Sequence, residues 1–284
     1  MAVKTCILTP DPGYHERWQV GADEYRALFG ERLSFRAWNG AHDLSSFDLI
    51  LPLLAWGYPK VPSRWFAALD DWEGQGLPFA NPIAMLRWNT DKDYLFDLES
   101  AGVAIVPTVE VHELKSTDLD EARAQFSCEM LIIKPPISAG ADKTYRLGKG
   151  DAVPFEVLET EMLIQPLMPA ISEEGEYSLF YFGGVLSHAI LKKPAAGDFR
   201  VQEQFGGREV TVDPPAAAQS LAKAALAAAP AAPAAPLYAR VDMVRDEAGG
   251  FRLMELEMIE PSLFLSFAPD KGAAFAAALH FLIA

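Results

Sequence analysis

The sequence predicts an α/β protein whose N-terminal part is doubly wound and whose later half is antiparallel sheet with flanking helices. Short apolar strand patterns alternate with helix patterns over the first eighty residues, an order typical of parallel βαβ units. The later half instead carries long strand pairs joined by glycine turns, at 176–193 and 236–258. Half of the 284 residues are hydrophobic and 22% are charged, which excludes a mainly disordered chain.

The N-terminal elements are predicted from hydrophobic pattern and turn residues. A β-branched run at 4–10 ends in a Pro-Asp-Pro-Gly turn, and the continuous apolar run at 47–56 is typical of a buried strand. A third strand is predicted at 32–38, where apolar and polar residues alternate, and helices are predicted at 18–30 and 63–73. Together these elements predict a small doubly wound domain over residues 1–82.

Residues 83–160 are predicted to form a central subdomain and residues 161–284 a C-terminal one. A helix is predicted at 89–102, with Asn89 or Thr90 as its N-cap and Gly102 at its C-terminal end. An alanine-rich helix is predicted at 216–229, followed by a stiff proline loop up to residue 236. The other predicted elements are a polar helix at 117–125, an amphipathic closing helix at 271–284, and strands at 103–111, 130–136, 144–150 and 161–169.

The charge balance excludes several classes of partner. Lys and Arg number 24 against 39 for Asp and Glu, giving a net charge of −15, so nucleic acid and anionic membranes are not expected partners. No segment is long and apolar enough to span a membrane, and the apolar start is too short for a signal peptide. Cys6 and Cys128 are expected to be buried, reduced thiols, and the protein is expected to be cytoplasmic.

The most informative pattern is an acidic hairpin at 238–258. A glycine turn near residue 248 places Asp242 opposite Glu255 and Arg240 opposite Glu257, with all four side chains on one face. At ~5 Å and an effective dielectric of ~20, the opposed carboxylates repel by roughly 3 kcal/mol. The cluster therefore needs a cation, which Arg240 or, better, Mg²⁺ would supply. In the Mg²⁺ interpretation, neutralising either opposed carboxylate should not destabilise the apoprotein. The alternative is a solvated acidic face. The opposite face carries residues expected in the core: Val241, Met254, Leu256 and Met258.

Two lysines stand where a positive charge is unfavourable. Lys134 ends a four-residue apolar run and pays a desolvation cost unless an anion meets it. The small loop after it, which includes Ser138 and Gly140, is of a type that presents backbone N–H groups to phosphates and closes as a lid. Lys92 lies near a helix start, where the macrodipole disfavours a cation. The alternatives are a lysine that reaches solvent from a strand end and a lysine on a helix surface.

A further source of local positive charge is the stretch 192–207. Lys192, Lys193 and Arg200 lie close together in this otherwise acidic chain. We predict Lys193 and Arg200 as catalytic residues. The alternative is a solvated basic loop. No short catalytic or nucleotide-binding signature accompanies these residues, because GxxxxGK[ST], GxGxxG, HExxH, CxxC and GxSxG are all absent.

The order of these segments resembles that of ATP-grasp ligases. In chain order they are WNTDKDYL, IIKPPISAG, LIQPLMPAISEEGEYSLF, KKPAAGDFRVQEQFGG, RVD and ELEMIEPSLF. The branch they most resemble is the prokaryotic glutathione-synthetase-like group, which includes the O-ureido-serine cyclo-ligases of D-cycloserine biosynthesis. The resemblance covers essentially the whole chain. It implies an N-terminal pre-grasp domain at 1–82 and two antiparallel-sheet subdomains that sandwich ATP.

The resemblance implies a nucleotide site. Lys92 and Lys134 are similar to the two lysines that hold the ATP phosphates in the family. Gln165 and Leu167 lie on the stretch that links the two grasp subdomains, where family backbone groups bind adenine. Glu176 resembles the acidic residue that accepts the ribose hydroxyls.

The resemblance also implies a metal site and a catalytic arginine. Asp242, Glu255 and Glu257 are similar to the metal ligands, which implies Mg²⁺, two ions, with Mn²⁺ as a substitute. Arg200 resembles the arginine that contacts the transferred phosphate and the acyl oxygen. Glutathione synthetases carry Asn at the third metal position and Arg where Ser178 stands here. Glu257 and Ser178 therefore argue against glutathione synthesis itself.

The implied activity is that of a carboxylate–amine ligase. A carboxylate attacks the γ-phosphate of ATP, and an amine captures the resulting acylphosphate to form a C–N bond, which needs no protein nucleophile. The expected substrate is small and amino-acid-like, and capture within one molecule would close a ring as in cycloserine biosynthesis. Family members are often dimers, so a homodimer is an expected assembly. Two alternatives stay open: a ligase that joins two amino-acid or peptide substrates, and a nucleotide-binding regulator or phosphotransferase without ligation.

Overall fold

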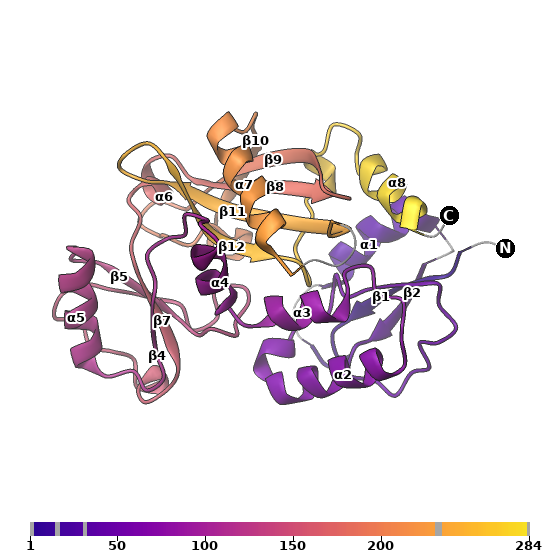
Figure 1. Cartoon of the computed structure of the whole chain (residues 1–284), viewed down its shortest axis with the longest axis horizontal. Helices are drawn as coiled ribbons and strands as arrows, with labels where there is room; N and C mark the ends of the chain where they lie inside the picture. The colour runs from indigo at the N-terminus through magenta and orange to yellow at the C-terminus, as the bar shows by residue number, and fades with distance from the viewer. Residues whose placement is uncertain (1–2, 15–17, 31–32, 231–234, 283–284) are drawn as a thin grey trace.

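Three sheets organise the chain in the computed structural model, which describes residues 3–14, 18–30, 33–230 and 235–282 (Figure 1). The first has three strands in the order β2-β1-β3, the second four in the order β4-β7-β5-β6, and the third five in the order β10-β9-β8-β11-β12. The first sheet is parallel and the other two are antiparallel. This is the predicted division between a doubly wound start and later antiparallel sheets.

The N-terminal sheet follows the predicted alternation of strand and helix. Its strands are β1 (Thr5–Thr9), β2 (Leu33–Ala37) and β3 (Leu49–Leu51), and its helices are α1 (Trp18–Phe29) and α2 (Pro62–Gly74). The apolar run at 47–56 yields only three strand residues, because Pro52 has no N–H to donate to a ladder.

The predicted helix at 89–102 is wrong at its start. Two helices occur instead, α3 (Ile83–Thr90) and α4 (Tyr94–Ser100), and Asp91 between them is extended. Asn89 does not cap a helix, because its side-chain amide donates to the Leu256 carbonyl (2.6 Å) and accepts from the Met258 N–H (2.7 Å). The break leaves Lys92 between the helices rather than in a first turn.

A second buried asparagine, Asn81, also ties the N-terminal part to the acidic hairpin. Its side-chain nitrogen donates to the carbonyls of Tyr238 (3.0 Å) and Met258 (2.8 Å), and its oxygen accepts from the Leu237 N–H (2.8 Å). Asn81 is fully buried and Asn89 nearly so, which makes both contacts costly to lose. The N-terminal domain and the hairpin are therefore joined through backbone groups.

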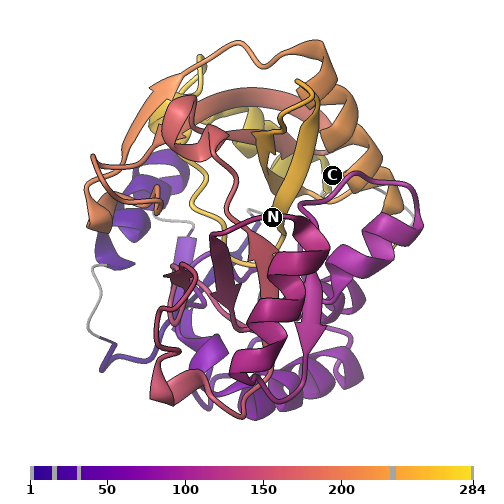
Figure 2. The ribbon, with the colours of Figure 1, turned by 90° about the vertical axis from the view of Figure 1, so that its left-hand side faces the viewer.

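The four-stranded sheet lies at one end of the molecule with helix α5 (Ser116–Phe126) against it, and Figure 2 shows this end toward the viewer. Its strands are β4 (Val109–Val111), β5 (Leu131–Lys134), β6 (Tyr145–Leu147) and β7 (Met162–Pro166). Because β7 pairs with both β4 and β5, this sheet extends past residue 160, where the sequence divided the central part from the C-terminal part.

The five-stranded sheet contains the predicted hairpin register. Asp242 pairs with Glu255 and Arg240 with Glu257, as predicted. A bulge follows, because Met243 pairs with Leu253 and leaves Met254 without a partner. Met254, predicted to lie in the core, is therefore half-buried: it lines the cavity described below and packs against a small apolar cluster that includes Val244. The strands are β8 (Glu176–Phe182), β9 (Val185–Lys193), β10 (Arg208–Thr211), β11 (Tyr238–Arg245) and β12 (Phe251–Glu257).

Two apolar helices cover this sheet. Alanines of α7 (Ala216–Ala228) pack against it on one side, and Phe275 of α8 (Ala273–Leu282) packs on the other, beside α1. The remaining helix is α6 (Ala170–Glu173). The predicted proline loop lies only partly within the described residues. The last two residues of the predicted closing helix (283–284) and the first residue of the predicted strand at 32–38 lie outside them.

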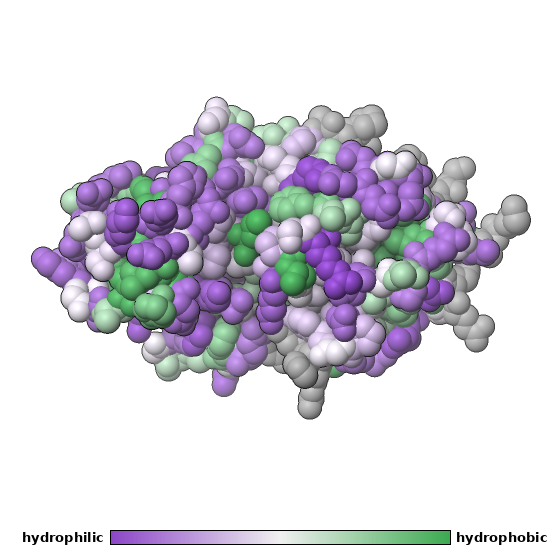
Figure 3. Space-filling view, turned by 90° about the horizontal axis from the view of Figure 1, so that it is seen from below, coloured by the Kyte–Doolittle hydropathy of each residue, from purple (hydrophilic) through white to green (hydrophobic). Residues whose placement is uncertain are grey.

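The two cysteines differ in burial. Cys6 is buried, as expected, whereas Cys128 is only half-buried, and both are free thiols. Hydrophilic side chains cover most of the face in Figure 3, with small hydrophobic patches between them. Within the described ranges, no helix has the length and apolar character needed to cross a membrane.

Candidate active site

A cavity of about 800 Å³ opens between the four-stranded sheet, the five-stranded sheet and loops of the N-terminal part. The hairpin β11–β12 and neighbouring β8 and β9 form its floor, the four-stranded sheet and its loop at 138–145 form one wall, and N-terminal loops at 14 and 56–60 form another. The cationic residues that line it include Lys92, Lys134, Lys192, Arg200 and Arg240. Local positive charge thus gathers here in a chain whose net charge is −15.

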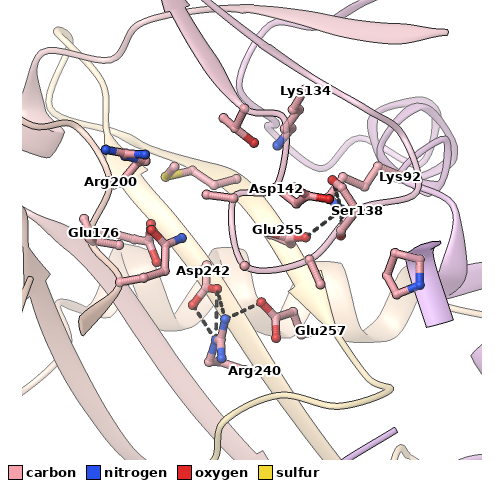
Figure 4. Close-up of a pocket in the computed structure, with 18 of the residues that line it drawn as sticks. Lys92, Lys134, Ser138, Asp142, Glu176, Arg200, Arg240, Asp242, Glu255 and Glu257 are labelled. Atoms are coloured by element: carbon pink, nitrogen blue, oxygen red, sulfur yellow. Dashed lines mark hydrogen bonds and ion pairs between the residues drawn. The ribbon is translucent and has the colours of Figure 1, made fainter. Parts of the chain in front are cut away.

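Arg240 occupies the centre of the acidic hairpin. Its guanidinium contacts Asp242 (Nη2–Oδ2 2.9 Å) and also pairs with Glu257 (Figure 4). The Ser178 hydroxyl donates to the same Asp242 carboxylate. Asp242 is only 3% exposed, which excludes the alternative of a solvated acidic face. Of the two cations that the sequence suggested for this cluster, Arg240 is in place.

The electrostatics of the three hairpin carboxylates differ. Burial acts to raise the pKa of Asp242, but Arg240 and Lys192 outweigh it and hold the pKa below its ordinary value. Burial also opposes the effect of Lys92 and Lys134 on Glu255, whose pKa is likewise lowered. For Glu257, burial prevails over Arg240 and raises the pKa to about 7. Two of the three groups are therefore held firmly as anions.

Lys92 connects the hairpin to the loop that follows Lys134. Its ammonium lies 3.1 Å from Glu255 Oε1 and donates to the Ser138 carbonyl at 2.6 Å. Its own backbone N–H donates to the Pro136 carbonyl (3.1 Å). Lys92 is 5% exposed, so it is not a helix-surface lysine.

Lys134 points into the same space from the end of β5 (Figure 4). Burial lowers its pKa to about 8, with Lys92 adding to the effect and Glu255 opposing it. Among the described residues its ammonium has no hydrogen bond or ion pair. Lys134 is thus a half-buried cation without an anionic partner, and an anionic ligand bound in the cavity would stabilise its charge.

Lys193 is not in the cavity, contrary to prediction, and its neighbour Lys192 is. Lys193 is exposed, because β9 turns successive side chains to opposite faces. Lys192 is 6% exposed and lies 3.1 Å from Glu176 Oε1 and 3.5 Å from Asp242 Oδ1. The sequence showed both lysines, but it did not give the register that selects between them.

Arg200, for which we predict a catalytic role, lines the cavity. Asp198 holds its guanidinium with two contacts (Nε–Oδ1 3.1 Å, Nη2–Oδ2 2.8 Å), and the guanidinium lies 3.7 Å from the centre of the Phe205 ring. This clamp orients the arginine without burying it. The alternative of a solvated basic loop does not fit a guanidinium held in this way.

The predicted nucleotide residues divide into those that reach the cavity and one that does not. Ser138, Gly140, Gln165 and Glu176 all line it. Leu167 lies outside it, and its backbone N–H already donates to the Met130 carbonyl (3.0 Å). In this conformation the Leu167 N–H is therefore already used within the protein, and the predicted role of Leu167 on an adenine-binding stretch stays a prediction.

The donor set on the hairpin fits hard divalent cations, because carboxylate oxygens are their preferred ligands. Asp242, Glu255 and Glu257 would hold such an ion once Arg240 and Lys92 yield some of their contacts. A separate group that the sequence analysis missed is Glu110, His112 and Glu161, whose ligand atoms lie within 4.8 Å of one another on the described surface. The alternation of Glu110 and His112 along β4 was the available signal.

Comparison with known proteins identifies what the chain is similar to. No family model matches it. It is 28% identical over 261 residues to the cycloserine biosynthesis protein DcsG of Streptomyces lavendulae, covering 85% of each chain. The crystal structure of the D-cycloserine synthetase DcsG matches with a TM-score of 0.85 and 25% identity, over 99% of this chain and 100% of that one.

More distant solved structures share the fold. A D-alanine–D-alanine ligase from Bacillus anthracis has a TM-score of 0.73 at 18% identity, over 99% of this chain and 96% of that one. The ATP-grasp ligase PsnB, complexed with a phosphomimetic variant of the minimal precursor, Mg and ADP, has a TM-score of 0.65 at 14% identity, over 99% of this chain and 100% of that one. The chain has the predicted ATP-grasp fold, and the predicted resemblance to cycloserine-type cyclo-ligases is confirmed.

Proposed function

We propose that this chain is an ADP-forming ATP-grasp ligase that activates the carboxylate of a small amino-acid-like substrate and forms a C–N bond, by ring closure within one molecule. The observation that carries the proposal is the meeting of Lys92 and Lys134 with the carboxylates of the acidic hairpin in one cavity. Lys134 comes from the four-stranded sheet, Lys92 from the break between α3 and α4, and the carboxylates from the five-stranded sheet. Separate parts of the fold thus meet at the site, as a site closed between two halves requires. The similarity to a D-cycloserine synthetase over almost the whole chain supports ring closure.

Each cavity residue has a role in this proposal. Lys92 and Lys134 bind phosphate oxygens, and the loop with Ser138 and Gly140 closes over them and excludes water. Arg200, pre-oriented by Asp198, stabilises negative charge that develops on the acyl oxygen and the transferred phosphate. Arg240 keeps Asp242 ionised and oriented.

ATP and Mg²⁺ would supply the remaining chemistry. When bound, ATP supplies the phosphoryl group that activates the carboxylate, and Mg²⁺ screens the phosphate charge. Asp242, Glu255 and Glu257 would hold the metal. We further propose two Mg²⁺ ions, replaceable by Mn²⁺, and a homodimer. Metal titration of activity and light scattering test these two points.

The test is an ADP-release screen against amino acids and their ureido and hydroxamate derivatives, with products identified by mass spectrometry. A cyclo-ligase releases ADP with a single substrate and no added amine. A ligase for two substrates requires a second, amine-bearing compound. A nucleotide-binding regulator or a phosphotransferase without ligation would bind ATP and form no C–N bond, and that result would refute the proposal.

A further inference from the structure

Glu260 lies in the cavity wall just beyond the acidic hairpin, three residues after Glu257. It is half-buried. The hairpin carboxylates all have cationic partners, Asp242 and Glu257 with Arg240 and Glu255 with Lys92. Glu260 has no ion pair within 4.0 Å to any residue in the described part of the chain. It is therefore an acidic side chain of the cavity whose charge the protein leaves unbalanced.

The facing wall supplies one neutral polar group. The Tyr58 side chain also lines the cavity and interacts with the Glu260 carboxyl group, and Tyr58 is only 5% exposed. Its loop is held tightly, because Gly57 has φ 88° and a Cβ there would lie 2.8 Å from the Tyr14 ring. Tyr58 also stacks on Trp65, with ring centres 4.6 Å apart. The hydroxyl is thus fixed before any ligand arrives.

We infer that Glu260, oriented by Tyr58, binds the α-ammonium group of the substrate whose carboxylate is activated. An ammonium group carries three N–H donors and one positive charge, and the oxygens of the Glu260 carboxylate can accept these N–H groups. The substrate would then span from Glu260 toward the cations on the other side of the hairpin. This inference rests on the proposed function and adds the residue that selects for an amino acid over its deaminated counterpart.

The surroundings of Glu260 are those of a carboxylate that a bound cation would stabilise. Burial, together with the nearby Glu257 and Glu255, raises the pKa of Glu260 well above its ordinary range. Lys92 opposes this effect only in part. The competing interpretation is a neutral carboxylic acid that only supports Tyr58. The two interpretations differ in what happens when the charge is removed and the shape kept.

The experiment compares wild-type protein with Glu260→Gln on matched probes. The amino-bearing probes are O-ureidoserine, serine and alanine in both configurations. Their partners are 3-(ureidooxy)propanoate, 3-hydroxypropanoate and propanoate, which have hydrogen in place of the α-ammonium. ADP release gives KM and kcat for each probe, and calorimetry gives the ATP affinity of each protein. Glu209→Gln is the matched control, because Glu209 lies on β10 at the opposite edge of the sheet and also lines the cavity.

Loss of a charge-assisted hydrogen bond corresponds to about a 10- to 100-fold loss of affinity. We therefore expect Glu260→Gln to raise KM for the preferred amino-bearing probe by about that factor and to leave the deaminated partner within about 2-fold. Tyr58→Phe should give a smaller loss, of about 3- to 10-fold. Glu209→Gln should leave the preference for the ammonium group unchanged. Where Glu260→Gln fails to fold, Glu260→Asp and Tyr58→Phe carry the same comparison.

The inference is overturned if Glu260→Gln keeps the wild-type preference, as a neutral supporting acid predicts. It is also overturned if wild-type protein prefers no amino-bearing probe while it still binds ATP, and in that case the nucleotide site of the proposed function stands. Absence of ATP binding in the wild type would remove both.

Discussion

Asp242→Asn should abolish turnover and weaken the apoprotein, whereas Glu255→Gln should abolish turnover with little loss of stability. Both variants remove one negative charge from the proposed metal site. They differ in what each carboxylate does in the protein without ligands. Asp242 is buried between Arg240, Lys192 and Ser178, while the Glu255 side chain is 31% exposed and pairs with Lys92.

The expected loss follows from these contacts. The guanidinium of Arg240 contacts the Asp242 carboxylate (Nη2–Oδ2 2.9 Å), and two unit charges ~4 Å apart interact by about 4 kcal/mol at an effective dielectric of ~20. Removing one partner of a buried pair costs about 3–5 kcal/mol, since the other charge is left uncompensated. For a chain of this size that lowers Tm by about 6–10 °C. Glu255→Gln leaves Lys92 its bond to the Ser138 carbonyl and should cost at most about 1 kcal/mol, or about 2 °C.

The assay is thermal unfolding of the apoproteins beside Mg²⁺-dependent ADP release on the same samples. Wild-type activity should vanish in EDTA, and MgATP should raise the Tm of wild type but of neither variant. Asp198→Asn serves as a control for loss of a carboxylate that contacts a cavity residue, Arg200, and is not a proposed metal ligand; the Tm of this variant should still rise with MgATP.

Two results would refute the reasoning. If the Tm of the Asp242→Asn apoprotein equals that of wild type, the ion pairs around Arg240 do not stabilise the fold. If either variant retains Mg²⁺-dependent turnover, the assignment of these carboxylates to the metal is wrong.

Three further predictions concern the cations. Lys192→Ala should lower kcat/KM by at least about 100-fold while Lys193→Ala stays near wild type, since only Lys192 reaches the cavity; equal effects in steady-state kinetics would contradict the register. Arg200→Ala should lower kcat by roughly 100- to 1000-fold with a much smaller change in ATP affinity by calorimetry, and equal losses would make Arg200 a ground-state phosphate clamp. Because the pKa of Lys134 is lowered from 10.5 to about 8, the folded protein loses this charge at a lower pH than the unfolded chain. The stability of wild type relative to Lys134→Met should therefore rise with pH between about 8 and 10.5, while ATP affinity falls, as denaturant melts and calorimetry at pH 7 and 9 would show.

The hairpin shows what the sequence could predict. A short glycine turn between two apolar strands determines the pairing, so the register of Asp242 with Glu255 follows from counting. The energetic consequence did not follow. Counting residues from the turn predicted a repelling pair of carboxylates, Asp242 and Glu255, whose neutralisation should not destabilise the apoprotein. In the structure the side-chain rotamers instead place Arg240 between Asp242 and Glu257, so Asp242 is part of an ion pair. Local pattern predicts which residues share a face, but it does not predict which of them pair.

Lys193 shows where counting fails. In the β8–β9 hairpin the register shifts between Phe180 and Tyr181, so Glu176 pairs with Lys192. Counting from the turn without this shift pairs Glu176 with Leu191, which would put Lys193 on the cavity face. One extra residue in a strand reverses which side chains face the cavity. Nothing in an apolar strand sequence announces such a bulge.

Asn89 was misassigned for a different reason. Asparagine before a helix pattern usually caps it, and only the distant hairpin backbone gives this side chain better partners.

Asn81 and Asn89 have a consequence for the order in which the chain folds during synthesis. Their backbone partners lie 156 to 177 residues further along. At a translation rate of about 5–20 residues per second, these partners are made roughly 10–30 s after the asparagines. Throughout that interval the N-terminal part of the chain on the ribosome has two side-chain amides that water must satisfy, on a surface that the hairpin will later cover. Docking of this N-terminal part is thus one of the last events of biogenesis, and a chain that stops before residue 237 would expose that surface to chaperones and proteases.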